Sequence, residues 1–148
     1  MTGTITRLPD LGWMLRPLTE IPGVRHVVVV SEDGLRLGHA SAEQLTGPVA
    51  ALSVGEAESL SAACAAMNMT GRSTASLVFG SGAGVRQLML ESEHGFVLFT
   101  HAGVGAHLGV ATGTDADVGL VAQQMQLLVA KIGAHLGSRP RDPVTGSS

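Results

Sequence analysis

The chain has 148 residues, a length that suits one domain with a single hydrophobic core. Hydrophobic residues make up 45% of the chain and charged residues 14%. The net charge is −3, basic residues do not form a run, and Phe and Trp together number four. This composition excludes a stacking surface for nucleic acid. The single cysteine excludes an internal disulfide and a cysteine-rich zinc site.

The first predicted element is an amphipathic helix of about three turns, after a short arm at residues 1–9. Asp10 stands at the N-cap position. The residues that share one helical face are Leu11, Met14, Leu15, Leu18 and Ile21. Pro17 lies inside this pattern and removes one backbone hydrogen bond, so we expect a kinked or shortened helix.

A β-hairpin follows this helix. Residues 24–31 (VRHVVVVS) are rich in β-branched side chains and predict a central strand. Residues 32–34 (EDG) predict a turn, and the alternating leucines of residues 35–39 predict a half-buried second strand. We expect residues 40–52 to form a loop with room for one helical turn, because a Gly-Pro pair interrupts any longer helix.

A long helix is predicted to begin at Ser53, which has the capping-box spacing to Glu56. The residues that recur at helical spacing are Leu60, Cys64, Met67, Gly71, Thr74 and Val78. The helix is expected to end before Gly80, a suitable C-terminal glycine. Gly71 costs the helix about 1 kcal/mol relative to alanine, so a break there is the alternative.

Three short strands are predicted after a flexible link at residues 80–84, namely residues 85–91, 96–101 and 106–112. Their short connections predict an antiparallel meander. Asp115 or Asp117 then caps a last helix. Its apolar face consists of Val118, Val121, Met125, Leu128, Ile132 and Leu136.

The predicted order is helix, two strands, long helix, three strands and helix. This order predicts an α/β domain over residues 10–136 with three α-β-α layers and a five-stranded, mainly antiparallel sheet. Residues 137–148 are polar and predict a disordered tail.

Glycines at residues 80–84 resemble a phosphate-binding loop, but the Lys-Ser/Thr pair of such a loop is missing and a strand follows. The chain is therefore not itself predicted to be a GTPase. A Gly-x-Ser-x-Gly elbow is also missing, although a Ser-His-Asp triad is recognised by geometry and stays open. We predict no catalytic residue and no cofactor.

The histidines do not follow any metal-binding motif, so we predict no metal site. Those that alternate on predicted strands and could converge in space are His26, His39, His101 and His107. Cys64 lies on an apolar helical face without a cationic neighbour, which indicates a core or interface residue and not a nucleophile.

Arg72 and Arg86 could each donate an arginine finger to a GTPase. We favour the alternative that Arg72 is a solvated helix residue and that Arg86 pairs across a dimer.

The element order and several local sequences resemble the roadblock/dynein light-chain family, especially its bacterial members of the actinobacterial conservon type. The matching pieces are residues 11–15, 21–26, 27–35, 85–91, 105–109, 115–121 and 124–129. The resemblance as a whole covers about residues 8–136. None is a catalytic signature, so the specificity of the resemblance comes from their order.

The resemblance implies a homodimer in which the long helices pack together and the third strands pair into one sheet. It also implies a non-catalytic adaptor or regulator of a small Ras-like GTPase, with a GTPase-activating role that needs no donated arginine. A sensor-kinase-like membrane protein is a further implied partner. The predicted dimer and partner interface consists of Leu60, Cys64, Met67, Met69, Gly71, Arg72, Val78, Arg86, Leu88 and Leu90.

A physical argument supports the dimer, because an unpaired strand at residues 85–91 would be an exposed sheet edge and two-fold pairing would cover it. The apolar stripe of the long helix could instead pack on its own sheet alone. A small-ligand-sensing module is the alternative function, and it requires a concave pocket with converging polar groups.

We expect a cytoplasmic protein that reaches membranes only through partners. The first residues include Pro9 and Asp10 and do not resemble a signal peptide, and the longest apolar run is residues 27–30.

Overall fold

The computed structural model describes residues 10–43, 51–103 and 105–137. The predicted arm at residues 1–9, residues 44–50 of the predicted loop and residues 138–148 of the predicted tail lie outside these ranges. The elements in chain order are the 3₁₀ helix η1 (Gly12–Leu15), α1 (Arg16–Thr19), β1 (Val24–Ser31), β2 (Arg36–Ser41), α2 (Val54–Phe79), β3 (Gln87–Ser92), β4 (Gly95–His101), β5 (Ala106–Thr112) and α3 (Val118–Gly137).

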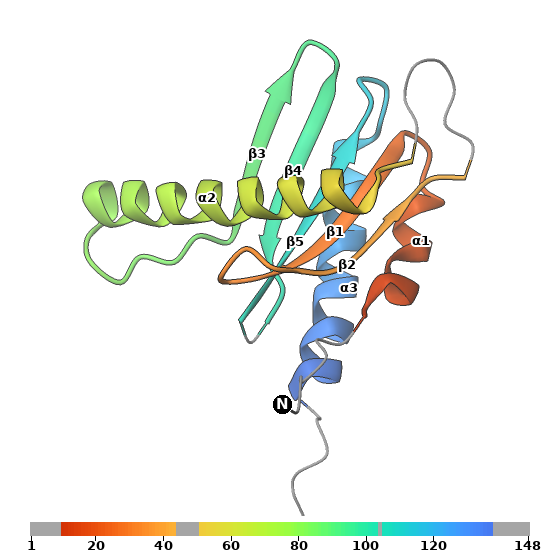
Figure 1. The fold of residues 1–148 in the computed structure, drawn as a ribbon. Helices are drawn as coiled ribbons and strands as arrows, with labels where there is room; N and C mark the ends of the chain where they lie inside the picture. The colour runs from red at the N-terminus through yellow and green to blue at the C-terminus, as the bar shows by residue number, and fades with distance from the viewer. Residues whose placement is uncertain (1–9, 44–50, 104, 138–148) are drawn as a thin grey trace, which may run out of the picture.

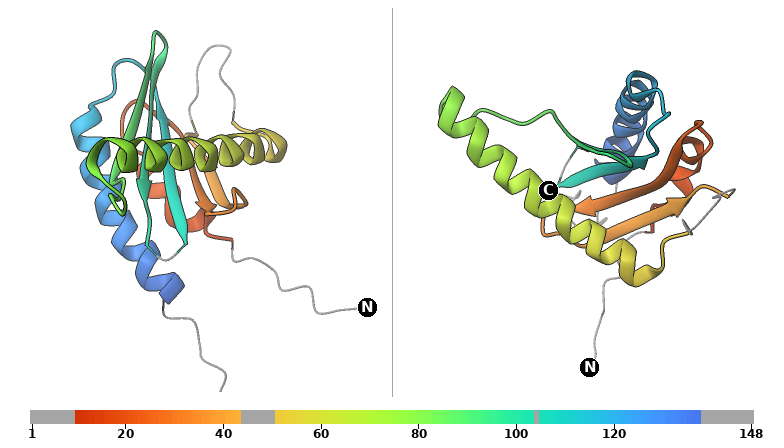
Figure 2. Two further views of the ribbon diagram at one scale, coloured as in Figure 1. Left: turned by 90° about the vertical axis from the view of Figure 1, so that its left-hand side faces the viewer. Right: turned by 90° about the horizontal axis from the view of Figure 1, so that it is seen from above.

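The five strands form one sheet in the order β2-β1-β5-β4-β3, and every neighbouring pair is antiparallel. The centre of the sheet joins β1 to β5, two strands from opposite ends of the fold in sequence. Helix α2 crosses one face of the sheet, whereas η1, α1 and α3 cover the other (Figure 1; Figure 2). The predicted three-layer α/β fold and the antiparallel meander of β3, β4 and β5 are confirmed.

The larger core lies between the sheet and the layer of η1, α1 and α3. It consists of alternate strand residues and the inward faces of the helices. Its fully buried members include Leu11, Leu15, Val27, Val29, Leu98, Leu108, Val110, Val121, Met125 and Ile132. The predicted apolar face of the last helix is confirmed, since Val121, Met125, Leu128 and Ile132 are all buried.

The smaller core lies between the opposite sheet face and α2. Its buried members are Val28, Val30, Cys64 and Phe99, with Leu60, Met67, Leu88 and Val97 packed around them. Two glycines let the helix approach the sheet. A Cβ on Gly71 would lie 3.0 Å from Leu88 Cδ1, and one on Gly109 would lie 3.0 Å from Cys64 Sγ.

The first helix is shortened, as expected from Pro17. One turn of 3₁₀ helix precedes a four-residue α-helix in which Pro17 is the second residue. A proline is tolerated there because the first amides of a helix have no intrahelical acceptor. The N-cap is Leu11 and not Asp10 as predicted, and no side chain of the described residues caps the helix. Asp10 precedes the cap, where its Oδ1 accepts a hydrogen bond from the Gly12 amide at 2.9 Å.

The long helix begins with the predicted capping box. The Glu56 amide donates to Ser53 Oγ at 3.1 Å, and the Ser53 amide donates to Glu56 Oε1 at 3.0 Å. The helix continues unbroken through Gly71 and ends before Gly80, which has a φ of 105°. Among the described residues, no helix is both long and apolar enough to span a membrane.

Some strand boundaries differ from those predicted, whereas β1 and β5 agree. β2 starts at Arg36 and continues to Ser41, because β1 still offers His26 as a pairing partner there. β3 starts at Gln87, so Arg86 precedes the strand; its carbonyl accepts a hydrogen bond from Thr100 Oγ1 at 2.9 Å. In α3, Asp117 is the N-terminal cap, since its Oδ1 accepts from the Leu120 amide at 3.1 Å.

Candidate partner-binding surface

The C-terminal half of α2 extends past the edge of the sheet and leaves apolar side chains exposed (Figure 1). Viewed from above, the helix leaves the sheet beyond β3 (Figure 2, right). The exposed fractions are 67% for Met69, 86% for Leu77 and 80% for Phe79. Large apolar side chains exposed together usually mark an interaction site.

The two edges of the sheet differ in how they are protected. β2 is covered by the N-terminal segment, where the Leu11 amide donates to the Leu37 carbonyl at 2.9 Å. Within the described ranges, β3 pairs with β4 alone, and Met89 and Leu90 on it are exposed. An open edge with exposed apolar side chains readily pairs with another chain.

The ten residues predicted for the interface fall into two groups. The exposed residues lie at or near the C-terminal half of α2 and the open edge of β3: Met69, Arg72, Val78, Arg86 and Leu90. The others pack at least partly against the chain itself: Leu60, Cys64, Met67, Gly71 and Leu88. Cys64 is almost fully buried, so its packing partners are residues of its own chain.

Cys64 lies on the sheet-facing side of α2, where burial raises the pKa of its thiol to about 12. The thiolate is the nucleophilic form of cysteine, and it is not populated near neutral pH with such a pKa. The position is therefore suited to packing, in agreement with the prediction.

The four strand histidines have different neighbours. His101 and His107 are cross-strand neighbours on β4 and β5, with ring centroids 5.2 Å apart. His26 Nδ1 lies 2.8 Å from Ser41 Oγ, and His39 Nδ1 lies 3.3 Å from Arg36 Nη1. In the described part of the chain, three or more His, Cys, Asp or Glu side chains do not gather at any point that could hold a metal ion.

His107 is buried between β5 and α2. Its Nε2 lies 3.2 Å from the Asn68 side-chain nitrogen, so the neutral ring accepts a hydrogen bond there. Burial lowers the pKa of His107, and the charges of His101 and Arg72 lower it further. This histidine is therefore built into the fold as a neutral group.

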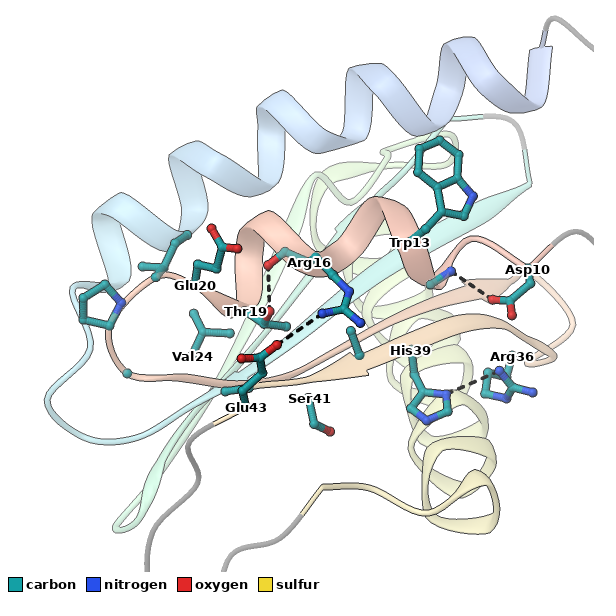
Figure 3. Close-up of a pocket in the computed structure, with 16 residues that line it drawn as sticks. Asp10, Trp13, Arg16, Thr19, Glu20, Val24, Arg36, His39, Ser41 and Glu43 are labelled. Carbon is teal, nitrogen blue, oxygen red and sulfur yellow. Dashed lines mark hydrogen bonds and ion pairs between the residues drawn. The ribbon is translucent and has the colours of Figure 1, made fainter.

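A wide polar hollow of about 990 Å³ lies between the first helical segment and β2 (Figure 3). Its charged side chains mostly engage one another: Arg16 pairs with Glu43 at 3.3 Å, and Arg36 lies beside His39. The ion pair is exposed to solvent and therefore weak.

The model of the roadblock/LC7 domain family matches residues 11–112. The chain belongs to the roadblock/LC7 domain family. This confirms the resemblance found in the sequence.

Relatives of this roadblock domain occur in archaea and bacteria. Two uncharacterized proteins of Methanocaldococcus jannaschii are each 34% identical over 121 residues, covering 82% of this chain and 95% of theirs. A crystal structure of a roadblock/LC7 domain from Streptomyces avermitilis superposes with a TM-score of 0.75 at 28% identity, covering 87% of this chain and 99% of that one.

MglB of Myxococcus xanthus has the same fold. Its TM-score is 0.72 at 15% identity, over 97% of this chain and 99% of that one.

Sequence reasoning missed several exposed apolar residues of this roadblock domain. Leu77, Phe79 and Met89 were not among the predicted interface residues, although all three are exposed. The run LVF at residues 77–79 is the signal that could have found two of them, because three consecutive apolar residues on a helix cannot all face one sheet.

Proposed function

We propose that this roadblock protein is a non-catalytic, homodimeric adaptor or regulator of a small Ras-like GTPase. The observation that carries the proposal is the overhang of α2 beside an open β3 edge, with Leu77 and Phe79 almost entirely exposed. Family membership supports the same conclusion, because the roadblock resemblance implies this class of partner.

In the proposed dimer, β3 pairs with its two-fold copy and the two α2 helices pack against each other. Two-fold pairing would extend the sheet across both protomers and cover Met89 and Leu90. The outward side of α2 carries small exposed residues, including Ala62, Ala63 and Ala66, which let a second helix approach closely.

The proposed GTPase surface is the part of the paired helices around residues 56–75. The exposed side chains there include Met69 and few charges, which favours an apolar contact. A sensor-kinase-like membrane protein is the further partner in this proposal. The Arg72 and Arg86 side chains are exposed, but the proposed regulation requires neither as an arginine finger.

Light scattering tests the dimer. Leu77→Glu should yield a monomer with unchanged circular dichroism, because Leu77 makes little contact within its own chain. The matched control is Leu127→Glu on the opposite layer, whose side chain is 57% exposed and which should remain a dimer. A Leu77→Glu protein that stays dimeric would contradict this placement of the interface.

A tagged pull-down from native lysate tests the GTPase partner. The bait is used with GDP or with a non-hydrolysable GTP analogue, and captured proteins are identified by mass spectrometry. Recovery of a small GTPase in one nucleotide state, and its loss with Leu77→Glu, is the expected result. Failure to recover a GTPase in either state would refute the proposal.

Hydrolysis assays with the recovered GTPase test the arginines. Arg72→Ala and Arg86→Ala should leave any acceleration of GTP hydrolysis within about twofold, whereas loss of an arginine finger costs about a thousandfold or more. A loss of that size in either variant would show that the protein does donate an arginine.

A further inference from the structure

The layer opposite α2 carries a second exposed apolar site. Trp13, the single tryptophan of the chain, is 65% exposed on η1. It lies beside α3 (Figure 3), where its ring meets His135 edge-on at a centroid distance of 5.8 Å. Leu127 on α3 is 57% exposed nearby and lines the same groove as Trp13. Exposed tryptophans are unusual and are enriched at binding hot spots.

Trp13 and α3 border an apolar groove of about 240 Å³. The groove is lined by Trp13, Met14, Pro17, Leu18, Gln124, Leu127, Leu128 and Lys131. Met14, Leu18 and Leu128 belong to the larger core and form its floor, whereas Trp13 and Leu127 stand above them at the rim. The floor is thus rigidly supported, and the exposed rim is the part that a partner would cover.

The shape of the groove favours a helical partner. It lies between the first helical segment and α3, and a helix packs well into the groove between two others. On α3 the outward stripe is Leu120, Gln124, Leu127 and Lys131, a row roughly 16 Å long at the rise of an α-helix. Three turns of a partner helix would match that length.

The charge of the groove favours some partner helices over others. Lys131 is the single charged side chain among the residues that line the groove, and it is the only lysine of the chain. In the described residues it forms no ion pair. An acidic residue on the partner would therefore meet an available cation, whereas a basic one would be repelled.

We propose that this groove binds an amphipathic helix from another protein, with an apolar stripe that packs on Trp13 and Leu127 and an acidic residue that pairs with Lys131. The site lies on the layer opposite the α2 surface, so it does not depend on the proposed dimer or on a GTPase partner. The roadblock protein would thereby hold two partners on its two sides.

Intrinsic fluorescence tests the groove directly, because Trp13 is the sole tryptophan and the chain contains no tyrosine. The probe is a synthetic helical peptide of about 16 residues with leucines along one face and one glutamate beside them, free of tryptophan and tyrosine. The expected result is a saturable blue shift of the Trp13 emission. A scrambled peptide of equal composition, which lacks the apolar stripe, should bind at least about tenfold more weakly.

Three variants test which residues form the peptide-binding groove. Leu127→Glu should weaken binding by about tenfold or more, because it places a charge in the apolar contact. Lys131→Glu should change the preference from the glutamate peptide to its lysine counterpart by about threefold, as expected for an exposed ion pair. Leu77→Glu on α2 should leave peptide binding unchanged and so separates this site from the proposed dimer surface.

Three outcomes of the peptide experiments would overturn the proposal. They are equal binding of the scrambled peptide, unchanged binding by a folded Leu127→Glu protein, and a charge preference that ignores Lys131→Glu. Self-association that Leu127→Glu abolishes would also overturn it, because a second copy would then be the occupant of the groove.

Discussion

The two faces of the sheet are covered in very different ways. On one face, α3 buries Val121, Met125, Leu128 and Ile132 against the larger core. On the other, α2 is the longer helix, yet the residues it buries are the small side chains of Ala57, Ser61 and Cys64. Burial of apolar area is the main source of folding stability, so the α3 face contributes more to the stability of the domain than the α2 face.

The small inward residues of α2 also explain its position on the sheet. A helix with small inward residues gains little from packing, but it approaches the sheet closely at Gly71 and Gly109 and then continues past β3. Apart from Val54, its exposed large apolar residues lie in the C-terminal half, which extends past the sheet. Weak packing on its own chain and a large free surface are therefore two results of the same sequence.

The largest expected effect is on the α3 face. Leu98→Ala removes a fully buried side chain from the larger core and should lower the free energy of unfolding by about 3 kcal/mol. Met67→Ala on the other face, where the side chain is partly exposed, should cost about 1 kcal/mol. Urea denaturation at one fixed protein concentration measures both. Equal losses would break the contrast between the two faces.

A smaller effect is expected where α2 contacts β5. Gly109→Ala places a Cβ 3.0 Å from Cys64 Sγ and 3.2 Å from Val28 Cγ2, so it should cost about 1–2 kcal/mol by overpacking. The second change Cys64→Ala removes the sulfur and should recover part of that loss. A double-mutant cycle by urea denaturation measures the coupling, and strictly additive losses would show that α2 is not seated on Gly109.

The smallest expected effect is a pH dependence of the α2 face. Burial lowers the pKa of His107 in the folded state below its ordinary value of 6.5, so the unfolded chain takes up the proton first. Stability from this group is therefore complete above pH 6.5 and declines as the pH falls from there to the folded-state pKa. His107→Gln, which keeps an acceptor for Asn68, should flatten this decline in thermal unfolding measured between pH 7.5 and 5.

A second histidine provides a control for that measurement. His26 also has a lowered pKa, through burial and the charge of Arg25, so a residual slope should remain in His107→Gln and disappear when His26 is replaced as well. An unchanged profile in His107→Gln would contradict the assignment.

Local chemistry was sufficient to predict most of the fold. The β-branched run of β1, the capping box of Ser53 and Glu56 and the apolar spacing of α3 act within a few residues, and the structure agrees with all three. The first helix is shortened as Pro17 indicated, because a proline is tolerated in a first turn and so divides the segment. Gly71 did not break α2, because the glycine serves a close approach to Leu88 that no local pattern reveals.

The candidate surfaces were predicted less well. Periodicity identifies which residues share a helical face, but it does not show where the sheet beneath that face ends. Cys64 and Leu77 both lie on α2, yet one is buried and the other is 86% exposed. The Trp13 groove depends on the packing of two segments far apart in the sequence, and such tertiary proximity leaves no local signal.

The central pairing of β1 with β5 has a consequence for how the protein forms. Every other strand pair is a hairpin of neighbouring segments, whereas this one closes a loop that contains β2, α2, β3 and β4. Long-range pairing is the slow step in folding because the chain entropy is lost before the contacts form. During synthesis, β1 must therefore wait until Thr112 has been made, and the larger core must wait further until Ile132 follows. In the N-terminal hairpin, the edge of β1 that pairs with β5 therefore stays unpaired for most of translation. The hairpin is the segment on which a chaperone would have the longest time to act.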